Sequence, residues 1–448
     1  MKQSKTSGTG IPGLATRKAA TRLLAAVIES GTSLDGLTDN EHGHPQYRAL
    51  DGRDRALVRA ILATALRFRC TIEALIARRL DRPLPHNATT LNHLLHVAAA
   101  QILFLDIPDS AAVDLAVEHA KSDPRTARFS GMVNGVLRAL VRVKDRALPA
   151  ALAQTVDAPD WFRERLTAAY GEDKAALILA RHRLEAPVDF TVRSDPGHWA
   201  ETLGGLALPT GSVRLAELQG PVTDLPGYDN GDWWVQDAAA ALPARLLGDI
   251  AGQRVADLCA APGGKTAQLI AAGARVTAVD ASRNRIARLK TNLDRLKLEA
   301  EIIEADVAAW EPSRLFDAVL LDAPCSSTGT VRRHPDVPWT KSPAEVDKLA
   351  GVQRRLLDAA VRLTRPGGRI VFSNCSLDPM EGETMVAAFL TSNPDVATDP
   401  VAPDEFPDLT GFITPQGWLR TTPADLTLEA ERLSGLDGFF AARLRKTG

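Results

Sequence analysis

The sequence predicts a multi-domain chain with an all-α N-terminal domain, a small α+β middle region and a C-terminal α/β domain whose sheet is mostly parallel. Up to about residue 143, apolar residues recur at spacings of three and four, which is the pattern of packed amphipathic helices. From Arg254 onward, short apolar runs alternate with helical segments, as in a parallel sheet covered on both faces. A chain of 448 residues is also too long for one ordinary domain.

We expect these domains at residues 14–145, 146–236 and 237–448, after a disordered tail at residues 1–13 that is rich in Gly, Ser and Lys. The clear helical segments of the first domain are at 15–30, 54–68, 90–105, 110–121 and 131–143. In the middle region, helices at 158–171 and 173–184 lead to short strand candidates such as 188–193. An alanine-rich helix at 237–248 then leads into the last domain, where strands are expected at 255–258, 275–280, 301–306, 316–322 and 368–375.

Charge is distributed unevenly along the chain, although the net charge is only −2. Residues 1–150 hold 21 Lys and Arg against 14 Asp and Glu, a balance of +7, whereas the remainder hold 32 against 41, a balance of −9. A positive arm on an acidic chain suits binding to a nucleic-acid backbone. Solvated arginines scattered over helices would give the same count, so charge alone leaves both interpretations open.

Several classes of protein are disfavoured by composition. No apolar run approaches the roughly 18 residues of a membrane span, and the N-terminus lacks the apolar stretch of a signal peptide, so we expect a cytoplasmic protein with no membrane partner. The four cysteines, at 70, 259, 325 and 375, form no CxxC or Cys/His pattern at zinc spacing, and structural disulfides are rare in the cytoplasm. We therefore expect no metal, and any special cysteine should act alone as a thiol.

A glycine-containing loop, DLCAAPGGKT at residues 257–266, follows the first strand of the alternating region and opens a helix. Gly263 and Gly264 allow the backbone to approach a ligand closely, and open α/β sheets bind ligands at the carboxyl ends of their strands. The next two strands each end in an acid, at Asp280 and Asp306. Because such carboxylates can accept hydrogen bonds from ribose hydroxyls, the pattern predicts a cofactor that contains a nucleoside.

A phosphate-binding loop is the sharpest alternative, because Gly264-Lys265-Thr266 matches the end of the G-x-x-x-x-G-K-[ST] motif. The first position of that motif is Cys259, however, where a glycine is needed to form the phosphate cradle. Carboxylates at the neighbouring strand ends would also repel a triphosphate. The sequence therefore favours the nucleoside cofactor over a nucleotide hydrolase.

Two cysteines follow neighbouring strand candidates: Cys325 in DAPCSS and Cys375 in SNCS. A cysteine is usually a small buried hydrophobe, which is our interpretation of Cys70 and Cys259, but loops at strand ends carry function and can expose a thiolate. A thiolate that adds to carbon 6 of cytosine makes carbon 5 able to attack the methyl group of a sulfonium. A carboxyl such as Asp322 could relieve charge at N3 of the ring.

Five segments resemble RNA cytosine-5 methyltransferases of the Sun/Fmu type: DLCAAPGGKT, AVDASRNRIARLKTNLDRL, DAPCSSTGTVRRHPDVPW, RPGGRIVFSNCSLDPMEGE and the ending DGFFAARLRK. The segment WWVQDAAAALPARLLG resembles the entry to the catalytic domain of that family. The helical arm, through VAAAQILFLDIPDSAAVDLAVEHAK and GMVNGVLRAL, is similar to NusB-like RNA-binding domains. This resemblance covers nearly the whole chain from about Thr16, and it implies a Rossmann-like methyltransferase that uses S-adenosylmethionine.

The resemblance also implies roles for individual residues. Cys375 matches the nucleophile and Cys325 matches the cysteine that helps to release the product, while Asp322 is expected to act on the base and to contact the cofactor. Asn374 departs from the family, which usually has threonine there. The full set of expected contacts with S-adenosylmethionine is Cys259, Ala260, Ala261, Pro262, Gly263, Gly264, Lys265, Asp280, Arg285, Asp306 and Asp322.

The NusB-like arm implies the ribosomal branch, the RsmB type, so we expect a monomeric enzyme that acts on 16S rRNA. A tRNA cytosine-5 methyltransferase and a non-catalytic NusB-like RNA-binding factor are the alternatives, and the second does not account for the two cysteines and the cofactor loop together. We expect residues 16–143 to fold independently and to add RNA affinity through arginines such as Arg53, Arg55 and Arg59.

Overall fold

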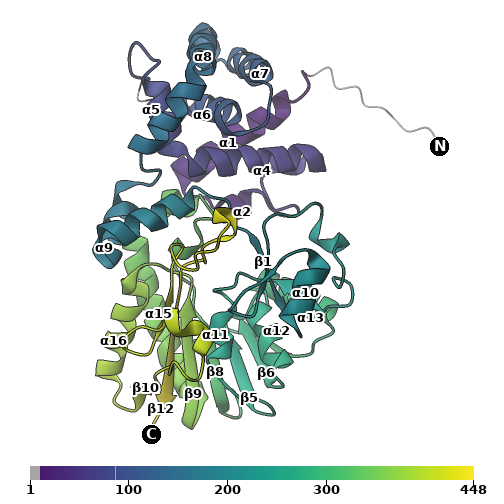
Figure 1. Cartoon of the computed structure of the whole chain (residues 1–448), viewed down its shortest axis with the longest axis vertical. Coiled ribbons are helices and arrows are strands. Elements are labelled where there is room, and N and C mark those ends of the chain that lie inside the picture. The colour runs from purple at the N-terminus through teal and green to yellow at the C-terminus, as the bar shows by residue number, and fades with distance from the viewer. Residues whose placement is uncertain (1–10, 86) are drawn as a thin grey trace, which may run out of the picture. The chain divides into compact units, whose positions relative to one another are not determined.

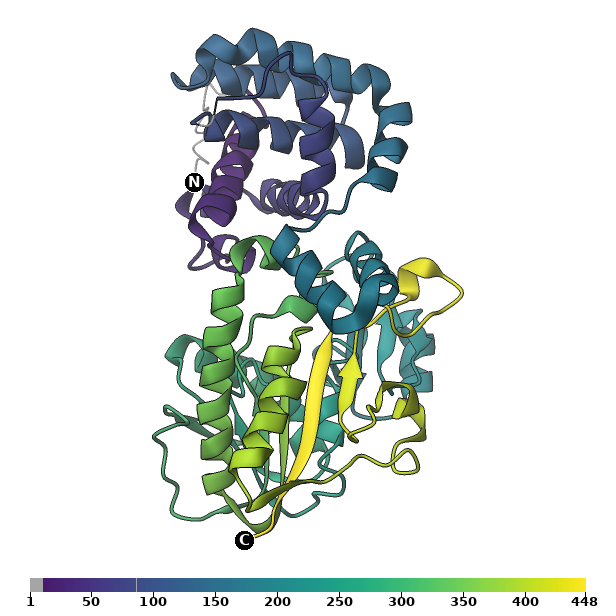
Figure 2. The same ribbon diagram turned by 90° about the vertical axis from the view of Figure 1, so that its left-hand side faces the viewer.

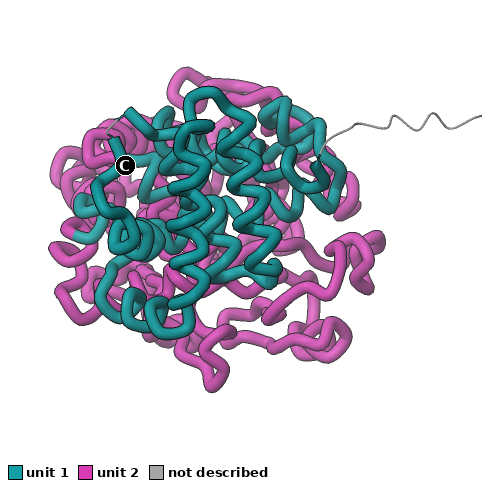
Figure 3. Tube along the Cα trace, turned by 90° about the horizontal axis from the view of Figure 1, so that it is seen from above, with its two compact units in different colours: residues 1–163, 334–341 teal, residues 164–333, 342–448 magenta. Residues whose placement is uncertain are grey.

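The structure is a computed structural model that describes residues 11–85 and 87–448. The described chain divides into two compact units, which Figure 3 distinguishes by colour. One runs to Arg163 and includes His334–Lys341, and the other consists of Glu164–Arg333 and Ser342–Gly448. Most of the tail expected at residues 1–13 lies outside the described residues, and the expected domain limits stay predictions. Within the described ranges, no helix is long and apolar enough to cross a membrane.

The first unit is all-α, as predicted (Figure 1). Helix α6 lies in its core, where it contacts α1, α4, α5, α7 and α8. Most side chains of α6 from Leu91 to Leu103 are buried, as expected for a helix that is apolar on every side. The helices are α1 (Leu14–Ser30), α2 (Leu34–Leu37), α3 (Pro45–Arg48), α4 (Gly52–Arg67), α5 (Arg69–Ala77), α6 (Thr89–Phe104), α7 (Asp109–Ser122) and α8 (Ser130–Gln154).

A segment that is distant in sequence completes the helical unit. It contains α14 (Val337–Thr340) and belongs to the residues 334–341 that cluster with the helices. The Leu34 backbone N–H donates a hydrogen bond to the Asp336 carboxylate at 2.9 Å. The Trp339 indole N–H donates to a backbone carbonyl of α4 at 3.2 Å, and the Arg69 guanidinium lies 5.6 Å from the centre of the Trp339 ring. The helical unit thus includes part of the segment that follows the Cys325 loop.

The second unit begins in α9 (Asp160–His182), whose backbone is non-helical at Gly171. A small antiparallel sheet follows, with strand order β2-β3-β1-β4 and with α10 (Pro196–Leu203) packed against β2 and β3. Its core includes Phe190 and Trp233, whose rings meet edge to face at 4.8 Å. The strands are β1 (Val188–Val192), β2 (Leu206–Ala207), β3 (Val213–Leu215) and β4 (Trp233–Val235).

The prediction of an alanine-rich helix at residues 237–248 is wrong for most of that range, because only α11 (Leu242–Arg245) is helical. Pro243 lies in the middle of the expected helix, where it has no N–H to donate to the Ala239 carbonyl and its ring crowds that carbonyl. The Ala238 N–H donates to the Asp189 carboxylate at 3.0 Å, and the Ala239 N–H donates to the Asp237 carboxylate at 2.8 Å. Side chains thus satisfy the N–H groups at the start of the segment, while Pro243 confines the helix to the short α11, which has a proline in its first turn.

The large sheet has the mostly parallel topology that the sequence predicts. Strands β9-β8-β5-β6-β7 are parallel in that order; beyond β9, β12 pairs antiparallel to β9, and β10 pairs antiparallel to β12. The strands are β5 (Arg254–Leu258), β6 (Arg275–Asp280), β7 (Glu301–Glu304), β8 (Phe316–Asp322), β9 (Thr364–Asn374), β10 (Val396–Thr398) and β12 (Phe439–Lys446), with β11 (Leu419–Thr421) paired to β12.

Helices cover both faces of this sheet. One face packs against α15 (Pro343–Leu363) and α16 (Glu383–Ser392), which lie side by side in Figure 2. The other packs against α11, α12 (Gly264–Ala271) and α13 (Arg283–Leu296). The parallel registers align the carboxyl ends of β5, β6, β8 and β9 at one edge, so the loops that follow these strands come together there.

Candidate active site

The expected cofactor loop connects β5 to α12 at this edge of the sheet. Gly263 has a φ of 101°, in the left-handed region that favours glycine, and a Cβ there would lie 3.3 Å from the Leu289 side chain. Gly264 begins α12 and faces the Gln236 side chain. The close approach of this backbone to a ligand stays a prediction; within the chain, Gly263 is required by its φ, whereas a Cβ at Gly264 would make only ordinary contacts. Cys259 also has a positive φ, of 61°.

The acids and the arginine near this loop support its backbone. The buried Asp280 carboxylate accepts a hydrogen bond from the Ala261 N–H at 3.2 Å. The Arg285 guanidinium donates to the Ala261 carbonyl at 2.7 Å and lies 3.3 Å from the Asp280 carboxylate. Asp306 is exposed two residues beyond β7, where it accepts a hydrogen bond from the Ala308 N–H at 3.0 Å. Asp280 and Arg285 thus hold the loop as one unit, and Asp306 remains open to solvent.

A cavity of about 520 Å³ lies against the loop. Asp257, near the end of β5, lines it and is fully buried. The Thr266 hydroxyl donates to one Asp257 oxygen at 2.6 Å, but no described residue donates to the other. An orphaned buried carboxylate oxygen is costly unless a ligand satisfies it. A cofactor with a positively charged group, such as a sulfonium, therefore fits this cavity. The other wall is formed by β4 and by residues of α13, including Trp234, Val235, Gln236, Asn292 and Arg295.

Burial raises the pKa of Asp257 to about 7. Below that pH the carboxyl is protonated and loses its attraction for a cation, so we expect binding of S-adenosylmethionine to weaken by about tenfold between pH 7 and pH 5.5. Calorimetry over this range would measure the effect. Asp257→Asn should bind weakly at pH 7 and show a flat profile, whereas an equal slope in both proteins would assign the titration to another group.

The same edge holds an ion pair between Lys265 and Asp322. The Lys265 ammonium lies 2.7 Å from one Asp322 oxygen, and the Ser373 hydroxyl donates to the other at 3.1 Å. The Lys265 side chain is buried and its ammonium also lies 4.9 Å from the centre of the Phe439 ring. A phosphate-binding loop would need a free lysine and a free Thr266 hydroxyl, and both are bound to carboxylates here. This geometry disfavours the nucleotide hydrolase.

The two cysteines of the strand ends are in contact. Cys325 follows β8 and Cys375 follows β9, and their sulfur atoms are 3.4 Å apart. The hydrogen bond between the two thiols lowers the pKa of Cys375 and raises that of Cys325 well above its usual value. The Ser327 hydroxyl, 3.6 Å from the Cys375 sulfur, acts in the same direction on Cys375. Cys375 is therefore the thiol that ionises first, which suits a nucleophile.

The other two cysteines lack these features. Burial raises the pKa of Cys259 to about 12, with Asp280 and Asp322 adding to the effect. Burial likewise raises the pKa of Cys70 to about 11. Neither thiol ionises readily, in agreement with the interpretation that both are packing residues. Among the described residues, no group of three or more His, Cys, Asp or Glu side chains is arranged to hold a metal ion.

Asn374, which departs from the resemblance, has a structural role next to Cys375. Its buried side-chain amide donates to the Glu381 carbonyl at 2.6 Å and accepts from the Ser376 N–H at 3.0 Å. A threonine could accept the second hydrogen bond but would reach the first less easily, because its hydroxyl is a single short group. The amide thus fixes the turn that carries the thiol.

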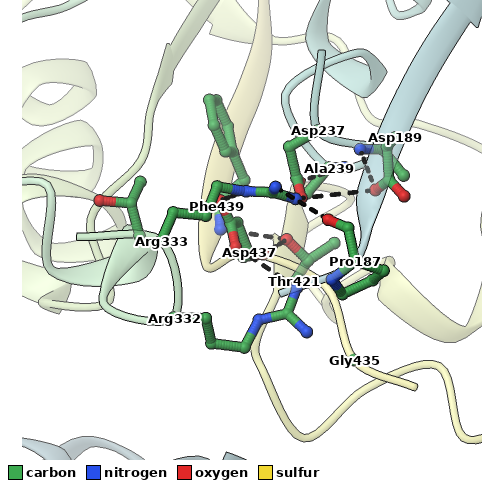
Figure 4. A network of polar contacts seen from close by, with 12 residues as sticks. Pro187, Asp189, Asp237, Ala239, Arg332, Arg333, Thr421, Gly435, Asp437 and Phe439 are labelled. Atoms are coloured by element: carbon green, nitrogen blue, oxygen red, sulfur yellow. Dashed lines mark hydrogen bonds and ion pairs between the residues drawn. The ribbon is translucent and has the colours of Figure 1, made fainter. Parts of the chain in front are cut away.

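A buried network of charges fixes the loop that leads away from Cys325 (Figure 4). The Arg333 guanidinium donates to the carboxylates of Asp437, at 3.0 Å, and Asp237, and to the Pro187 carbonyl at 3.0 Å. Asp189, which also lies near Arg333, accepts two hydrogen bonds from a buried arginine of β3. Removing one partner of such a buried pair typically costs about 3–5 kcal/mol. The network therefore ties the Cys325 loop to the small sheet, to the segment before β12 and to the cavity wall at Asp237.

Comparison with known proteins identifies the family. The family model described as 16S rRNA methyltransferase RsmB/F matches residues 244–445, and the NusB family model matches residues 14–142. The chain is 38% identical over 411 residues to the ribosomal RNA small subunit methyltransferase B of Xanthomonas campestris pv. campestris, covering 88% of this chain and 91% of that protein. The chain belongs to the RsmB/F methyltransferase family.

Two further comparisons cover nearly the whole RsmB/F chain. The ribosomal RNA small subunit methyltransferase B of Xylella fastidiosa is 38% identical over 452 residues, which cover 97% of this chain and 98% of that protein. The crystal structure of PH0851 has the same fold, with a TM-score of 0.72 at 22% identity, and covers 98% of this chain and 99% of that one. These findings confirm the predicted class, an S-adenosylmethionine-dependent RNA methyltransferase with a NusB-like domain, and they contradict the hydrolase and the non-catalytic factor.

Sequence reasoning missed three residues of this RsmB/F site. Asp257 is the last residue but one of β5, and Asp280 ends β6, so the position of Asp257 near a strand end was a usable signal. Arg333 and Glu381 lie in segments that resemble the family, but their role depends on contacts with residues far away in the sequence. No local pattern indicates such contacts.

Proposed function

We propose that this enzyme methylates carbon 5 of a cytosine in 16S rRNA through a covalent adduct between Cys375 and the base. The observation that carries this function is the thiol pair: two sulfur atoms 3.4 Å apart at the ends of adjacent parallel strands, beside the Lys265–Asp322 ion pair. The relatives named ribosomal RNA small subunit methyltransferase B support rRNA as the substrate. A cytoplasmic location and a monomeric state stay predictions.

The residues would divide the reaction between them. The ionised Cys375 sulfur bonds to carbon 6 of the cytosine, and the electron pair displaced toward N3 takes up a proton that the Asp322 carboxylate relays from the Lys265 ammonium with which it is paired. When bound, S-adenosylmethionine supplies an electrophilic methyl group. Once the Cys375 sulfur is bonded to carbon it no longer raises the pKa of Cys325, so Cys325 can release its thiol proton to solvent and, as a thiolate, take the proton from carbon 5. The bond between carbon 6 and sulfur then breaks, and Cys375 leaves as a thiolate.

The cofactor would be held by the loop between β5 and α12 and by the acids around it. We assign Cys259–Lys265, Asp280, Arg285, Asp306 and Asp322 to this role, as the sequence suggested, and we add Asp257 because its orphaned oxygen lines the cavity. Asp280 and Arg285 act by holding the loop backbone. Asp306 is the exposed acid that a nucleoside can reach without displacing another partner.

Bisulfite sequencing of total RNA tests the substrate directly. A strain without the gene should lose one 5-methylcytosine signal in 16S rRNA, and a plasmid copy should restore it. Loss of a tRNA signal instead would favour the tRNA enzyme that the sequence left as an alternative. Unchanged cytosine methylation in both RNAs would contradict the proposed reaction.

The helical unit should contribute to RNA affinity. Its arginines differ in whether the guanidinium already donates to a backbone carbonyl of the protein. Arg55 donates to the Arg48 carbonyl at 2.5 Å and Arg59 donates to the Thr38 carbonyl at 2.6 Å, whereas Arg53 is exposed at the start of α4. We expect Arg53→Gln to weaken rRNA binding and to reduce the slope of log affinity against log salt by about 1, as for one lost phosphate contact. Filter binding at several salt concentrations measures this slope.

Arg355→Gln, a change of an exposed arginine on α15, is the matched control. Unchanged affinity and slope in Arg53→Gln would mean that the positive balance of the N-terminal region is only a solvated surface at this position.

A further inference from the structure

We infer that Glu381 is a positioning residue that holds the two reactive thiols in contact; this inference rests on the proposed function. Glu381 follows β9 and is fully buried. Its carboxylate accepts hydrogen bonds from the Ser326 N–H at 2.8 Å, from the Ser376 hydroxyl at 2.6 Å and from the Gln353 amide at 3.0 Å. The Ser326 hydroxyl is a fourth donor.

These donors adjoin the two thiols in sequence. Ser326 directly follows Cys325, and Ser376 directly follows Cys375. Gln353, from α15, also donates to the carbonyl of the residue before Cys325 at 3.0 Å. The backbone carbonyl of Glu381 accepts from the side chain of Asn374, the residue before Cys375, at 2.6 Å. The residues on both sides of both thiols are therefore tied to Glu381, directly or through Gln353.

The contacts through Glu381 are needed because the pairing of β8 with β9 ends before the two thiols, so the sheet does not fix the two loops there. The register of β8 and β9 ends at the pair Asp322 and Ser373, before either cysteine. Beyond that pair, the N–H of Gly329 donates to the Cys375 carbonyl at 2.9 Å, and the contacts through Glu381 add the side-chain link. The hydrogen bond between the thiols depends on their separation, so the ionisation of Cys375 depends on this link.

The hydrogen bonds of Glu381 allow a variant that keeps the geometry of the link but removes the charge of the carboxylate. One Glu381 oxygen receives the two nitrogen donors, and the other receives the two serine hydroxyls, which can accept as well as donate. In Glu381→Gln, the amide oxygen can face the nitrogen donors while the amide NH₂ donates to the two serine hydroxyls. Glutamine can thus preserve the link without a carboxyl, whereas alanine removes it.

The test measures the pH dependence of Cys375 alkylation by iodoacetamide in the full chain, with the labelled residue identified by mass spectrometry. Glu381→Ala should move the midpoint upward by about one pH unit, because the thiol pair separates. It should also lower kcat by about 100-fold, as for a misplacement near 1 Å, while KM for RNA and cofactor changes less than about threefold. Glu381→Gln should keep the midpoint and retain kcat within about fivefold.

Glu405→Ala is the control for lost stability. Glu405 lies 2.6 Å from the buried Arg443, in the same unit, and has no contact with the thiol loops among its described contacts. It should leave the alkylation midpoint unchanged. If Glu381→Ala does not fold, Ser376→Ala, which removes one of the four donors, should shift the midpoint in the same direction by a smaller amount.

An unchanged midpoint and kcat in Glu381→Ala would overturn the positioning role. Equal losses in Glu381→Gln and Glu381→Ala with an unchanged midpoint would also overturn it and assign Glu381 to stability alone. Alkylation needs neither RNA nor cofactor, so the midpoint reports on the thiol pair even if the reaction assigned to Cys375 is wrong. The two failures can therefore be told apart.

Discussion

Replacing Cys375 with alanine is expected to lower methyl transfer by at least about 10⁴-fold, because the reaction loses its nucleophile. No covalent complex with RNA should form in this variant. The physical reason is the ionisation of the pair: hydrogen bonding lowers the pKa of Cys375 and raises that of Cys325. Transfer of a labelled methyl group from S-adenosylmethionine to 16S rRNA measures the loss.

Cys325→Ala should behave differently, since Cys325 is assigned to the step after methyl transfer. The variant should form the bond between Cys375 and carbon 6 and methylate carbon 5, and then fail to release the base. A denaturing gel with substrate RNA and cofactor should show a slowly migrating protein–RNA band for Cys325→Ala only. Cys70→Ala, a change in the helical unit, is the control and should show neither loss nor band.

Other outcomes of the gel would change the assignment. A band for Cys375→Ala instead of Cys325→Ala would exchange the roles of the two thiols. If neither variant traps RNA and both stay fully active, covalent catalysis by this pair is wrong. Cys325→Ala also removes the hydrogen bond to the Cys375 sulfur, so the adduct should form more slowly than in the unmodified enzyme.

Asp322→Asn is expected to lower kcat by about 10²- to 10³-fold, the second largest effect. The change removes the charge that pairs with the buried Lys265 ammonium at 2.7 Å, and it removes the carboxyl assigned to N3 of the base. An uncompensated buried charge next to the cavity should also disturb the edge of the sheet. Single-turnover methylation at saturating RNA and cofactor separates this loss from weaker binding.

Asp317→Asn is a matched control for Asp322→Asn, because Asp317 lies on the same strand β8, near its other end. Its carboxylate pairs with Arg365 at 2.8 Å and accepts a hydrogen bond from the Arg254 N–H at 2.8 Å. The control should lower stability without lowering kcat. Equal kcat values in the two variants would show that the charge at Asp322 does not act in the reaction.

Part of the site could be predicted because the relevant signals are local. Cys325 and Cys375 each follow a strand that contains a short apolar run, and parallel strands bring their carboxyl ends to one edge. The sequence therefore placed both thiols near the cofactor loop without a structure. The prediction failed at residues 237–248, where alanine propensity indicated a helix but Pro243 interrupts the helical hydrogen bonds and only α11 forms.

By itself, the sequence determined the main helices of the N-terminal region, the five parallel strands, the cofactor loop and the pair of strand-end cysteines, because periodicity and strand ends are properties of neighbouring residues. Only the tertiary structure decided that the two sulfur atoms touch and that Cys375 ionises before Cys325. The link through Glu381 and the addition of residues 334–341 to the helical unit were also decided there. Burial and hydrogen bonding between residues far apart in the chain set these features, and no local pattern encodes them.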